Sequence, residues 1–201
     1  MAKSILDEND YAASIRQMRK SVLGMTSDAA KEWQRRTEAE FELWARKKRS
    51  CDATGINNFY GLQQLALTSW LLSGDVFAVM KQQSPTPLNP YSLRIHLVEA
   101  DRVMTPIGKG STYPSVTDGK NPDNGNRIFD GVEVNHDGQI VAYHICIHFP
   151  GQVTSEPNEF VRVEAYGSMT GLPNVLQIMD SERPEQYRGI SYLAQVIEPM
   201  L

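Results

Sequence analysis

The sequence has few residues of the kinds that mark secreted, membrane-spanning or disulfide-rich proteins. Its two cysteines, Cys51 and Cys146, are far apart and have no CxxC partner, so we expect free thiols. No apolar run approaches the ~20 residues that a bilayer span requires. The first residues also lack the basic-then-apolar pattern of a secretory signal. These absences favour a soluble protein in the cytoplasm where it is made, with no membrane partner.

Sequence motifs of enzyme active sites are missing as well. The chain contains no GxSxG, HExxH or GxGxxG. The stretch "GKGSTYPS" lacks the GxxxxGK[ST] spacing of a phosphate-binding loop and the helix that should follow it. Glu99 and Asp101 share a predicted strand face, but nothing marks them as acid/base partners. We therefore expect no enzymatic activity and no cofactor.

Charge is distributed unevenly along the 201 residues. Residues 1–50 contain 11 Lys and Arg against 8 Asp and Glu, whereas residues 51–201 contain 9 against 16. An acidic main body argues against a protein that coats a DNA duplex, because such proteins neutralise many phosphates. The candidates for a local nucleic-acid contact are Arg46, Lys47, Lys48 and Arg49. Basic residues at a helix C-terminus also complement the helix dipole, which explains this run at least as well.

Apolar periodicity predicts three helices in the first third of the chain. The first covers residues 11–25. The second, over 27–50, has an aromatic stripe on one side, charges on the other and Ser27 as its N-cap. The third, over 57–73, is apolar all round, so we expect it to be buried from several sides, with Gly74 ending it.

After Gly74 the period changes to two, which predicts strands. Residues 75–81 and 93–103 read as strands, and residues 128–149 read as a hairpin with its turn at "NHDG". A further strand is predicted within "EFVRVEAY". The segment 104–127 is rich in Gly, Pro, Asn and Ser and lacks periodicity, so we expect an exposed, mobile loop.

The order of these elements predicts an α+β fold, with N-terminal helices packed on a small, mainly antiparallel sheet. We expect a single domain over residues 1–201. It comprises a helical part (1–74), a strand-rich part (75–180), and a segment (181–201) that starts a further helix.

The most specific candidate for a chemical site is "YHICIHF". His144, Cys146 and His148 alternate along a predicted strand and so point to one face, as metal ligands on a sheet do. Successive ligands on one strand lie about 7 Å apart, so neighbouring strands would have to complete the site. The alternative is a half-buried face in which Cys146 acts as a small apolar residue.

Five segments of the sequence are informative together because of the order in which they occur. They are "NDYAASIRQMRKSVLGM", "LWARKKRSCDATGINNFYGLQQLALTSWLLSGDVFAV", "HLVEADRVMTP", "IFDGVEVNHDGQIVAYHI" and "SERPEQYRGISYLAQVI". Together they resemble the portal proteins of the lambda family of tailed bacteriophages over nearly the whole chain. In one departure, Glu185 stands where the family commonly has Gly, which puts the geometry of that turn in question.

The resemblance implies a structural role in the virion. Such a protein forms a dodecameric ring at one capsid vertex, docks the terminase, passes double-stranded DNA, and contacts capsid and head-tail connector proteins. Assembly would take place in the cytoplasm of the bacterial host, and ATP hydrolysis would belong to the terminase. The chain most resembles the peripheral, wing-like part of the subunit. Arg183 and Arg188 would then be candidates for a subunit interface, the alternative being packing of a turn within one chain.

The end of the sequence also bears on this interpretation. An apolar helical stripe runs from Leu193 to Leu201 without a cap. Family members continue past this helix into the tunnel region, so we expect an interior portion of a longer protein, excised or left by a decayed prophage gene. Two other functions stay open: a metal-dependent enzyme on the His144, Cys146 and His148 face, and another head-tail connector protein.

Overall fold

The computed structural model describes residues 24, 26–106, 119–149 and 159–194. The predicted helix over 11–25, apart from Gly24, and most of the predicted terminal helix lie outside these residues. The chain divides into two compact units, Met1–Ala45 and Arg46–Leu201, each of which is described by itself. Among the helices within the described ranges, none is both long and apolar enough to span a membrane.

Helix α2 (Ser27–Arg46) is the described element of the first unit and confirms the predicted amphipathic helix. Its N-cap is Thr26, not the predicted Ser27, because the Thr26 hydroxyl accepts a hydrogen bond from the Ala29 amide at 3.3 Å. The helix ends earlier than predicted because Lys47 has an extended backbone, with φ −85° and ψ 112°. Asp28 in the first turn suits the dipole of the helix.

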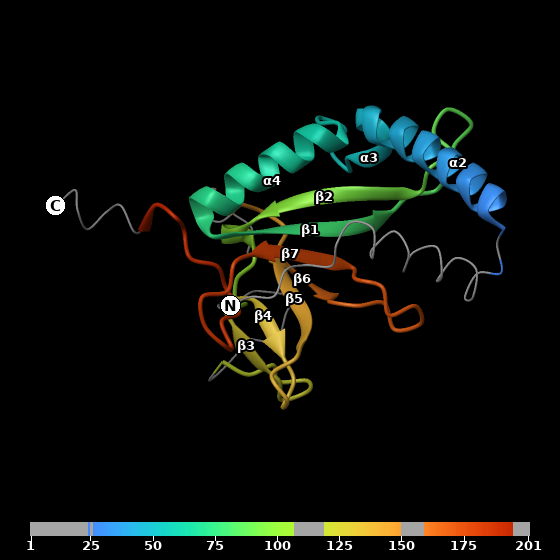
Figure 1. Cartoon of the computed structure of the whole chain (residues 1–201). Helices are drawn as coiled ribbons and strands as arrows, with labels where there is room; N and C mark the ends of the chain where they lie inside the picture. The colour runs from blue at the N-terminus through green and yellow to red at the C-terminus, as the bar shows by residue number, and fades with distance from the viewer. Residues whose placement is uncertain (1–23, 25, 107–118, 150–158, 195–201) are drawn as a thin grey trace, which may run out of the picture. The chain divides into compact units, whose positions relative to one another are not determined.

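The second unit begins with a short helix, α3 (Lys48–Cys51), followed by α4 (Phe59–Ser73). Asn58 caps α4, because its side-chain oxygen accepts a hydrogen bond from the Gly61 amide at 2.9 Å. Gly74 ends the helix in the left-handed conformation (φ +90°), as predicted. Figure 1 shows α4 lying across strands β1 and β2.

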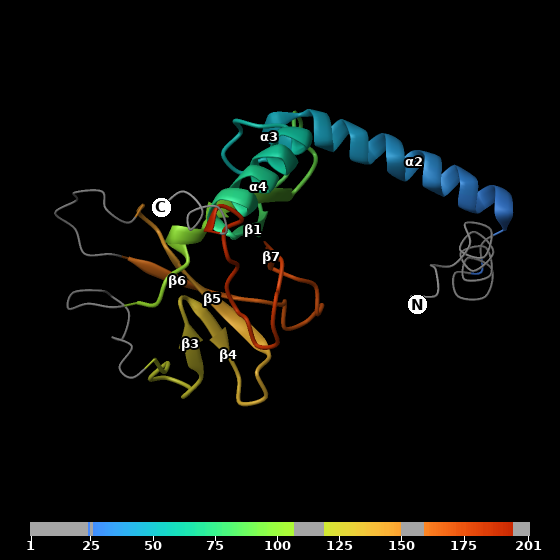
Figure 2. The same ribbon diagram turned by 60° about the vertical axis from the view of Figure 1, so that its left-hand side comes forward.

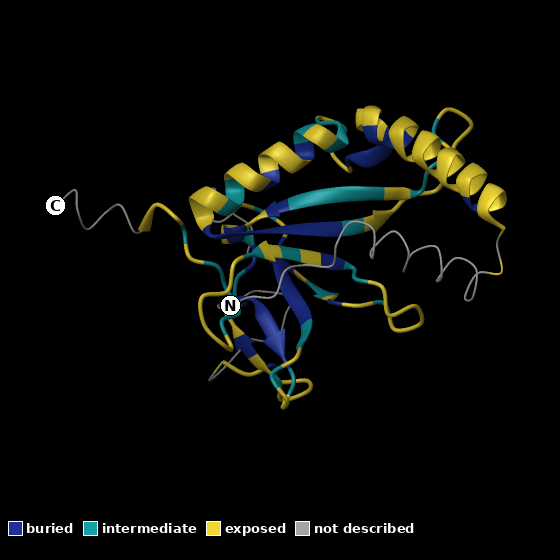
Figure 3. Ribbon diagram, viewed as in Figure 1, coloured by how far each residue is buried: buried dark blue, intermediate teal, exposed yellow. Residues whose placement is uncertain are grey.

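The prediction that α4 is buried from several sides is wrong for the single chain. Its buried residues are Leu62 and Ala66. Five large side chains are 40–54% exposed; this α4 face consists of Tyr60, Leu65, Leu67, Leu71 and Leu72. Exposed residues run along the helix in Figure 3. A helix that is apolar all round needs cover on every side, and the sheet of this chain covers one side.

The first sheet has the strand order β2-β1-β7 and is antiparallel throughout. It consists of β1 (Asp75–Gln82), β2 (Leu93–Glu99) and β7 (Val175–Met179). A short 3-10 turn, η1 (Ala100–Arg102), follows β2. The strands β1 and β2 confirm the periodicity prediction, whereas β7 was not predicted.

The second sheet has the order β3-β4-β5-β6 and is also antiparallel. Its strands are β3 (Arg127–Phe129), β4 (Val132–Val134), β5 (Ile140–Cys146) and β6 (Phe160–Glu164). Asp130 and Gly131 form the two-residue turn between β3 and β4, with φ of 46° and 85°, as a type I′ turn requires. The predicted "NHDG" turn joins β4 to β5, with Gly138 at φ +80°.

The core of the second unit lies between the two sheets, whose arrangement is clearest in Figure 2. Phe77 of β1 and Tyr143 of β5 meet edge to face there, with ring centroids 5.5 Å apart. The α+β class is confirmed, with the strands divided between two sheets where the sequence predicts one. Both cysteines are buried free thiols.

Residues 119–127, the last part of the segment predicted as a structureless loop over 104–127, are folded, and the prediction is wrong for them. Lys120 and Arg127 form a β-bridge, and Asn121 is only 3% exposed. The Gly125 amide donates a hydrogen bond to the Asn121 carbonyl at 2.8 Å. The Asn and Gly residues here specify turns, so the loss of periodicity does not mean a lack of structure. Residues 107–118 of the segment lie outside the described residues.

Candidate functional site at the junction of the two sheets

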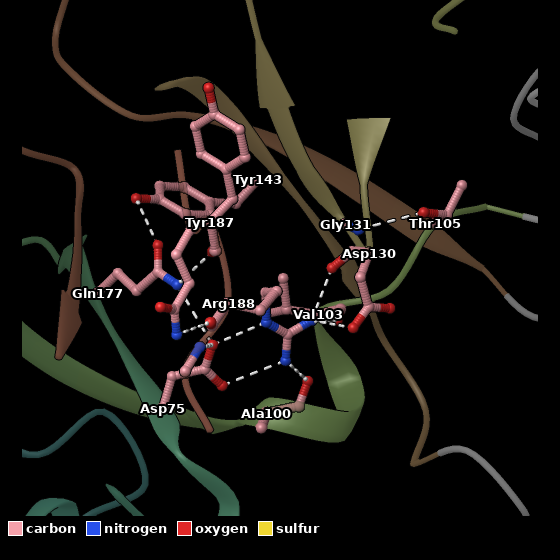
Figure 4. Close-up of polar contacts among 12 residues, drawn as sticks. Asp75, Ala100, Val103, Thr105, Asp130, Gly131, Tyr143, Gln177, Tyr187 and Arg188 are labelled. Atoms are coloured by element: carbon pink, nitrogen blue, oxygen red, sulfur yellow. Dashed lines mark hydrogen bonds and ion pairs between the residues drawn. The ribbon is translucent and has the colours of Figure 1, made fainter. Parts of the chain in front are cut away.

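Arg188 joins the closing segment of the chain to the first residue of β1 (Figure 4). Its Nε donates to Asp75 Oδ2 at 2.7 Å and its Nη2 to Asp75 Oδ1 at 3.2 Å. The Asp75 side chain is 1% exposed and that of Arg188 is 19% exposed. A two-pronged ion pair of this kind fixes both position and orientation.

The remaining N–H groups of Arg188 bind the turns that follow β2 and β3. Nη2 donates to the Ala100 carbonyl at 3.0 Å, and Nη1 donates to the Val103 carbonyl at 2.8 Å. Nη1 also reaches the carbonyl of Asp130 at 2.6 Å and its carboxylate at 2.8 Å. All five N–H groups of the guanidinium therefore have acceptors. One side chain ties four separate stretches of sequence together.

Asp75 collects donors besides Arg188. Gln177 Nε2 of β7 lies 3.2 Å from Oδ2, and the Gly189 amide lies 3.1 Å from the same oxygen. Gln177 Nε2 also donates to the Tyr187 carbonyl at 2.9 Å. The Asp75 carboxylate is thus occupied by structural hydrogen bonds, and neither of its oxygens is placed to transfer a proton to a substrate.

Three glycines allow the backbones at this junction to approach one another. A Cβ on Gly74 would lie 2.5 Å from the Ile190 carbonyl carbon, and one on Gly189 would overlap the Gly74 carbonyl oxygen. A Cβ on Gly131 would lie 2.5 Å from the Met104 nitrogen. Any side chain at these positions would force the segments apart.

A second buried polar centre surrounds Glu133 of β4, whose side chain is fully buried. Arg162 of β6 donates to it through Nε at 2.8 Å and Nη2 at 3.0 Å, and His144 Nε2 lies 2.9 Å away. Three amides of the 119–127 turn also donate to it at 2.7–3.1 Å, namely Asn121, Asn124 and Asn126. This centre pins the turn to the second sheet.

Hydrogen bonding decides the charge state of this centre. Burial by itself raises the pKa of Glu133, but the hydrogen bonds from Arg162 and the three asparagines outweigh it and hold the pKa well below its usual value. Burial lowers the pKa of His144, and the bond to Glu133 offsets this only in part. An ionised Glu133 therefore accepts from a neutral His144, with the positive charge supplied by Arg162.

The structure places two of the three candidate metal ligands on one strand and the third beyond its end. His144 and Cys146 are buried on β5, and His144 Nε2 is engaged by Glu133. His148 lies beyond the end of β5 at Cys146. The described part of the chain holds no group of three or more side chains suited to a metal ion. His144 thus has a structural partner in Glu133.

The other predicted site residues also have defined positions. The run from Arg46 to Arg49 is exposed at the junction of α2 and α3. Arg188 pairs with the carboxylates of Asp75 and Asp130 of its own chain. Arg183 is exposed on the turn before it. No local pattern indicates the roles of Asp75, Asp130 and Glu133, apart from the Gly beside each of the two aspartates.

Comparison with known proteins decides the family. The sequence model described as "Phage portal protein, lambda family" matches residues 13–201. The chain belongs to this family. A "Probable portal protein" of Halomonas phage phiHAP-1 is 26% identical over 177 residues, which cover 87% of this chain and 30% of that relative. This portal-family chain therefore spans less than a third of the length of that relative.

The junction around Arg188 is built from the segments of the sequence that resemble the portal family. Four of the phrases that resemble portal proteins supply its parts: Gly74 and Asp75, the Ala100–Val103 turn, Asp130 and Gly131, and Arg188 and Gly189. In this portal-family chain these four segments, far apart in the sequence, thus contact one another in the fold. The junction holds the closing segment against both sheets.

Proposed function

We propose that this chain is part of a structural protein of the phage portal vertex. The observation that carries the proposal is the match of the lambda-family portal model over residues 13–201. The protein would form a dodecameric ring in the virion, assembled in the host cytoplasm. Double-stranded DNA would pass through this ring, and terminase, capsid and head-tail connector proteins would dock on it.

Two features support a structural role. The buried carboxylates Asp75 and Glu133 are saturated with donors, which suits them to holding shape and not to acid/base chemistry. Residues 51–201 carry 9 Lys and Arg against 16 Asp and Glu. A predominantly negative body does not grip a translocating duplex tightly, because strong binding to DNA depends on neutralising phosphates.

The α4 face supports assembly. Its five large side chains are left exposed by the described part of the chain, and exposed apolar groups of this kind mark protein–protein contacts. A ring is built from heterologous contacts, in which one surface of a subunit meets a different surface of the next. We propose that the α4 face is one side of such a contact.

The test is the mass of the assembly under native conditions. We expect native mass spectrometry and electron microscopy of a version that includes the rest of the portal sequence to show a ring. Leu67→Glu with Leu71→Glu should reduce it to monomers, since charge on a buried apolar contact is costly. Leu88→Glu, at a leucine that is 88% exposed outside α4, is the matched control and should leave the ring intact. A monomeric long protein would overturn the proposed function.

A further inference from the structure

A pocket of about 290 Å³ lies where β1 and β2 meet the loop after α3. Lys81 of β1 and Arg94 and His96 of β2 line it, together with Thr54 and two glutamines. The described residues that line it include no carboxylate. The pocket is separate from the junction at Arg188 and from the Glu133 centre.

The two permanent positive charges of this pocket stand in an unfavourable arrangement. Lys81 and Arg94 are directly opposite each other in the antiparallel pairing of β1 and β2. Like charges in this position repel each other and destabilise a sheet. Across the described ranges, neither residue forms an ion pair with a carboxylate. The repulsion is therefore not relieved within the described part of the chain.

Arg94 also carries an unused donor. One of its terminal nitrogens, Nη1, donates to the Arg49 carbonyl oxygen. Its Nε is buried and has no hydrogen-bond partner among the described residues. Buried donors are nearly always paired in native proteins, so an unpaired one indicates a missing acceptor.

The other ionisable groups around the pocket do not supply that acceptor. Asp52 is buried next to the loop, but its oxygens accept from the amides of Thr54, Ile56 and Asn57 and from the Thr54 hydroxyl at 2.8–3.0 Å. Burial, followed by the charges of Lys81 and Arg102, lowers the pKa of His96, while Asp52 opposes this. His96 thus adds a polar imidazole without adding a third repelling charge at neutral pH.

We propose that this pocket binds a phosphoryl group. Two permanent charges call for an anion of more than one charge, and the guanidinium fork of Arg94 matches phosphate oxygens. The glutamine amides add neutral donors for further oxygens. A single protein carboxylate has one charge and two oxygens and would leave part of this donor set unused. The exposed basic run at Arg46–Arg49 adjoins Arg94 through the Arg49 carbonyl, and it extends the positive surface for a charged ligand.

The test is calorimetric titration of the chain with inorganic phosphate, and fluorescence anisotropy with a short DNA duplex, at pH 7 and constant ionic strength. Lys81 is exposed, so Lys81→Gln should fold normally. We expect Lys81→Gln to weaken binding about tenfold, the effect of losing one charge-assisted hydrogen bond. Lys120→Gln removes the same charge outside the pocket and should leave the affinity unchanged.

Each arm has a decisive outcome. Loss of phosphate affinity in Lys81→Gln supports a site for free phosphoryl compounds, and loss of duplex affinity alone supports one for the nucleic-acid backbone. The proposal is overturned if neither ligand binds, if Lys120→Gln has the same effect, or if sodium chloride or acetate reproduces the phosphate signal. None of these outcomes depends on ring formation, so failure here leaves the proposed function standing.

Discussion

Replacing Arg188 with alanine should destabilise the second unit by about 3–5 kcal/mol, the usual cost of removing one partner of a buried ion pair. The size of the loss follows from Asp75, which is 1% exposed and would keep a charge without its main partner. The carbonyls of Ala100 and Val103 would lose donors as well. For a unit of this size, a loss of this magnitude lowers the unfolding midpoint by about 10 °C.

The assay is urea unfolding followed by tryptophan fluorescence and circular dichroism. Arg183→Ala is the matched control: it removes an exposed arginine five residues away and should change the free energy of unfolding by less than ~0.5 kcal/mol. A double-mutant cycle with Asp75→Asn isolates the pair and should give a coupling energy of about 1–3 kcal/mol. A loss below about 1 kcal/mol in Arg188→Ala would refute the account of the junction as a buried ionic clamp.

Two further predictions concern the turn and sheet around this unit. Glu133→Gln should cost about 2–3 kcal/mol, because it weakens hydrogen bonds to a charged acceptor. Since the pKa of Glu133 is lower in the folded protein than in the unfolded chain, its contribution to stability is present above about pH 4.5 and is lost as the pH falls below that value. The free energy of unfolding, measured from pH 6 to 3, should therefore fall less steeply in Glu133→Gln than in the unaltered chain. Glu159→Gln, at an exposed residue, is the control and should keep the original slope. Glu185→Gly should stabilise the chain by about 0.5–1 kcal/mol. It removes the cost of a left-handed backbone at a residue with a side chain (φ 57°), and the higher entropy that glycine gives the unfolded chain cancels part of this gain. The measurement is thermal unfolding of Glu185→Gly compared with the control Glu182→Gly, at a residue whose φ is not positive. A lower unfolding temperature for Glu185→Gly would contradict the prediction.

Elements with a strong local pattern could be predicted from the sequence. Helix α2 and the strands β1 and β2 each show their own period, and Gly74 and Gly138 mark ends that require a positive φ. Strand β7 has only five residues and was missed, because a run that short carries little periodic signal.

The buried polar centres could not be predicted, because their partners are far apart in sequence. Arg188 and Asp75 are separated by 113 positions, and Arg162 and Glu133 by 29. Nothing local distinguishes a carboxylate that will be buried in a ring of donors from one that will be solvated. The asparagines of the 119–127 turn illustrate this, since their composition indicated a loop whereas their side chains bind Glu133.

The metal hypothesis shows a limit of strand periodicity. Alternation places His144 and Cys146 on the same face of β5, as the metal hypothesis requires. In the structure five consecutive residues of β5, through Cys146, are buried, so both faces of this part of the strand are covered. A strand buried on both faces has no outward side, so alternation says nothing about access to it.

The difference between Gly74 and Glu185 shows why one left-handed position tolerates a side chain and the other does not. Both positions have a positive φ. At Gly74 a side chain would also collide with the backbone of Ile190, so conformational cost and steric overlap add together. Residue 185 is exposed, so a side chain there bears only the conformational cost, which a stable unit can tolerate at about 1–2 kcal/mol. A glutamate can therefore occupy that turn while the glycines at the junction have no substitute.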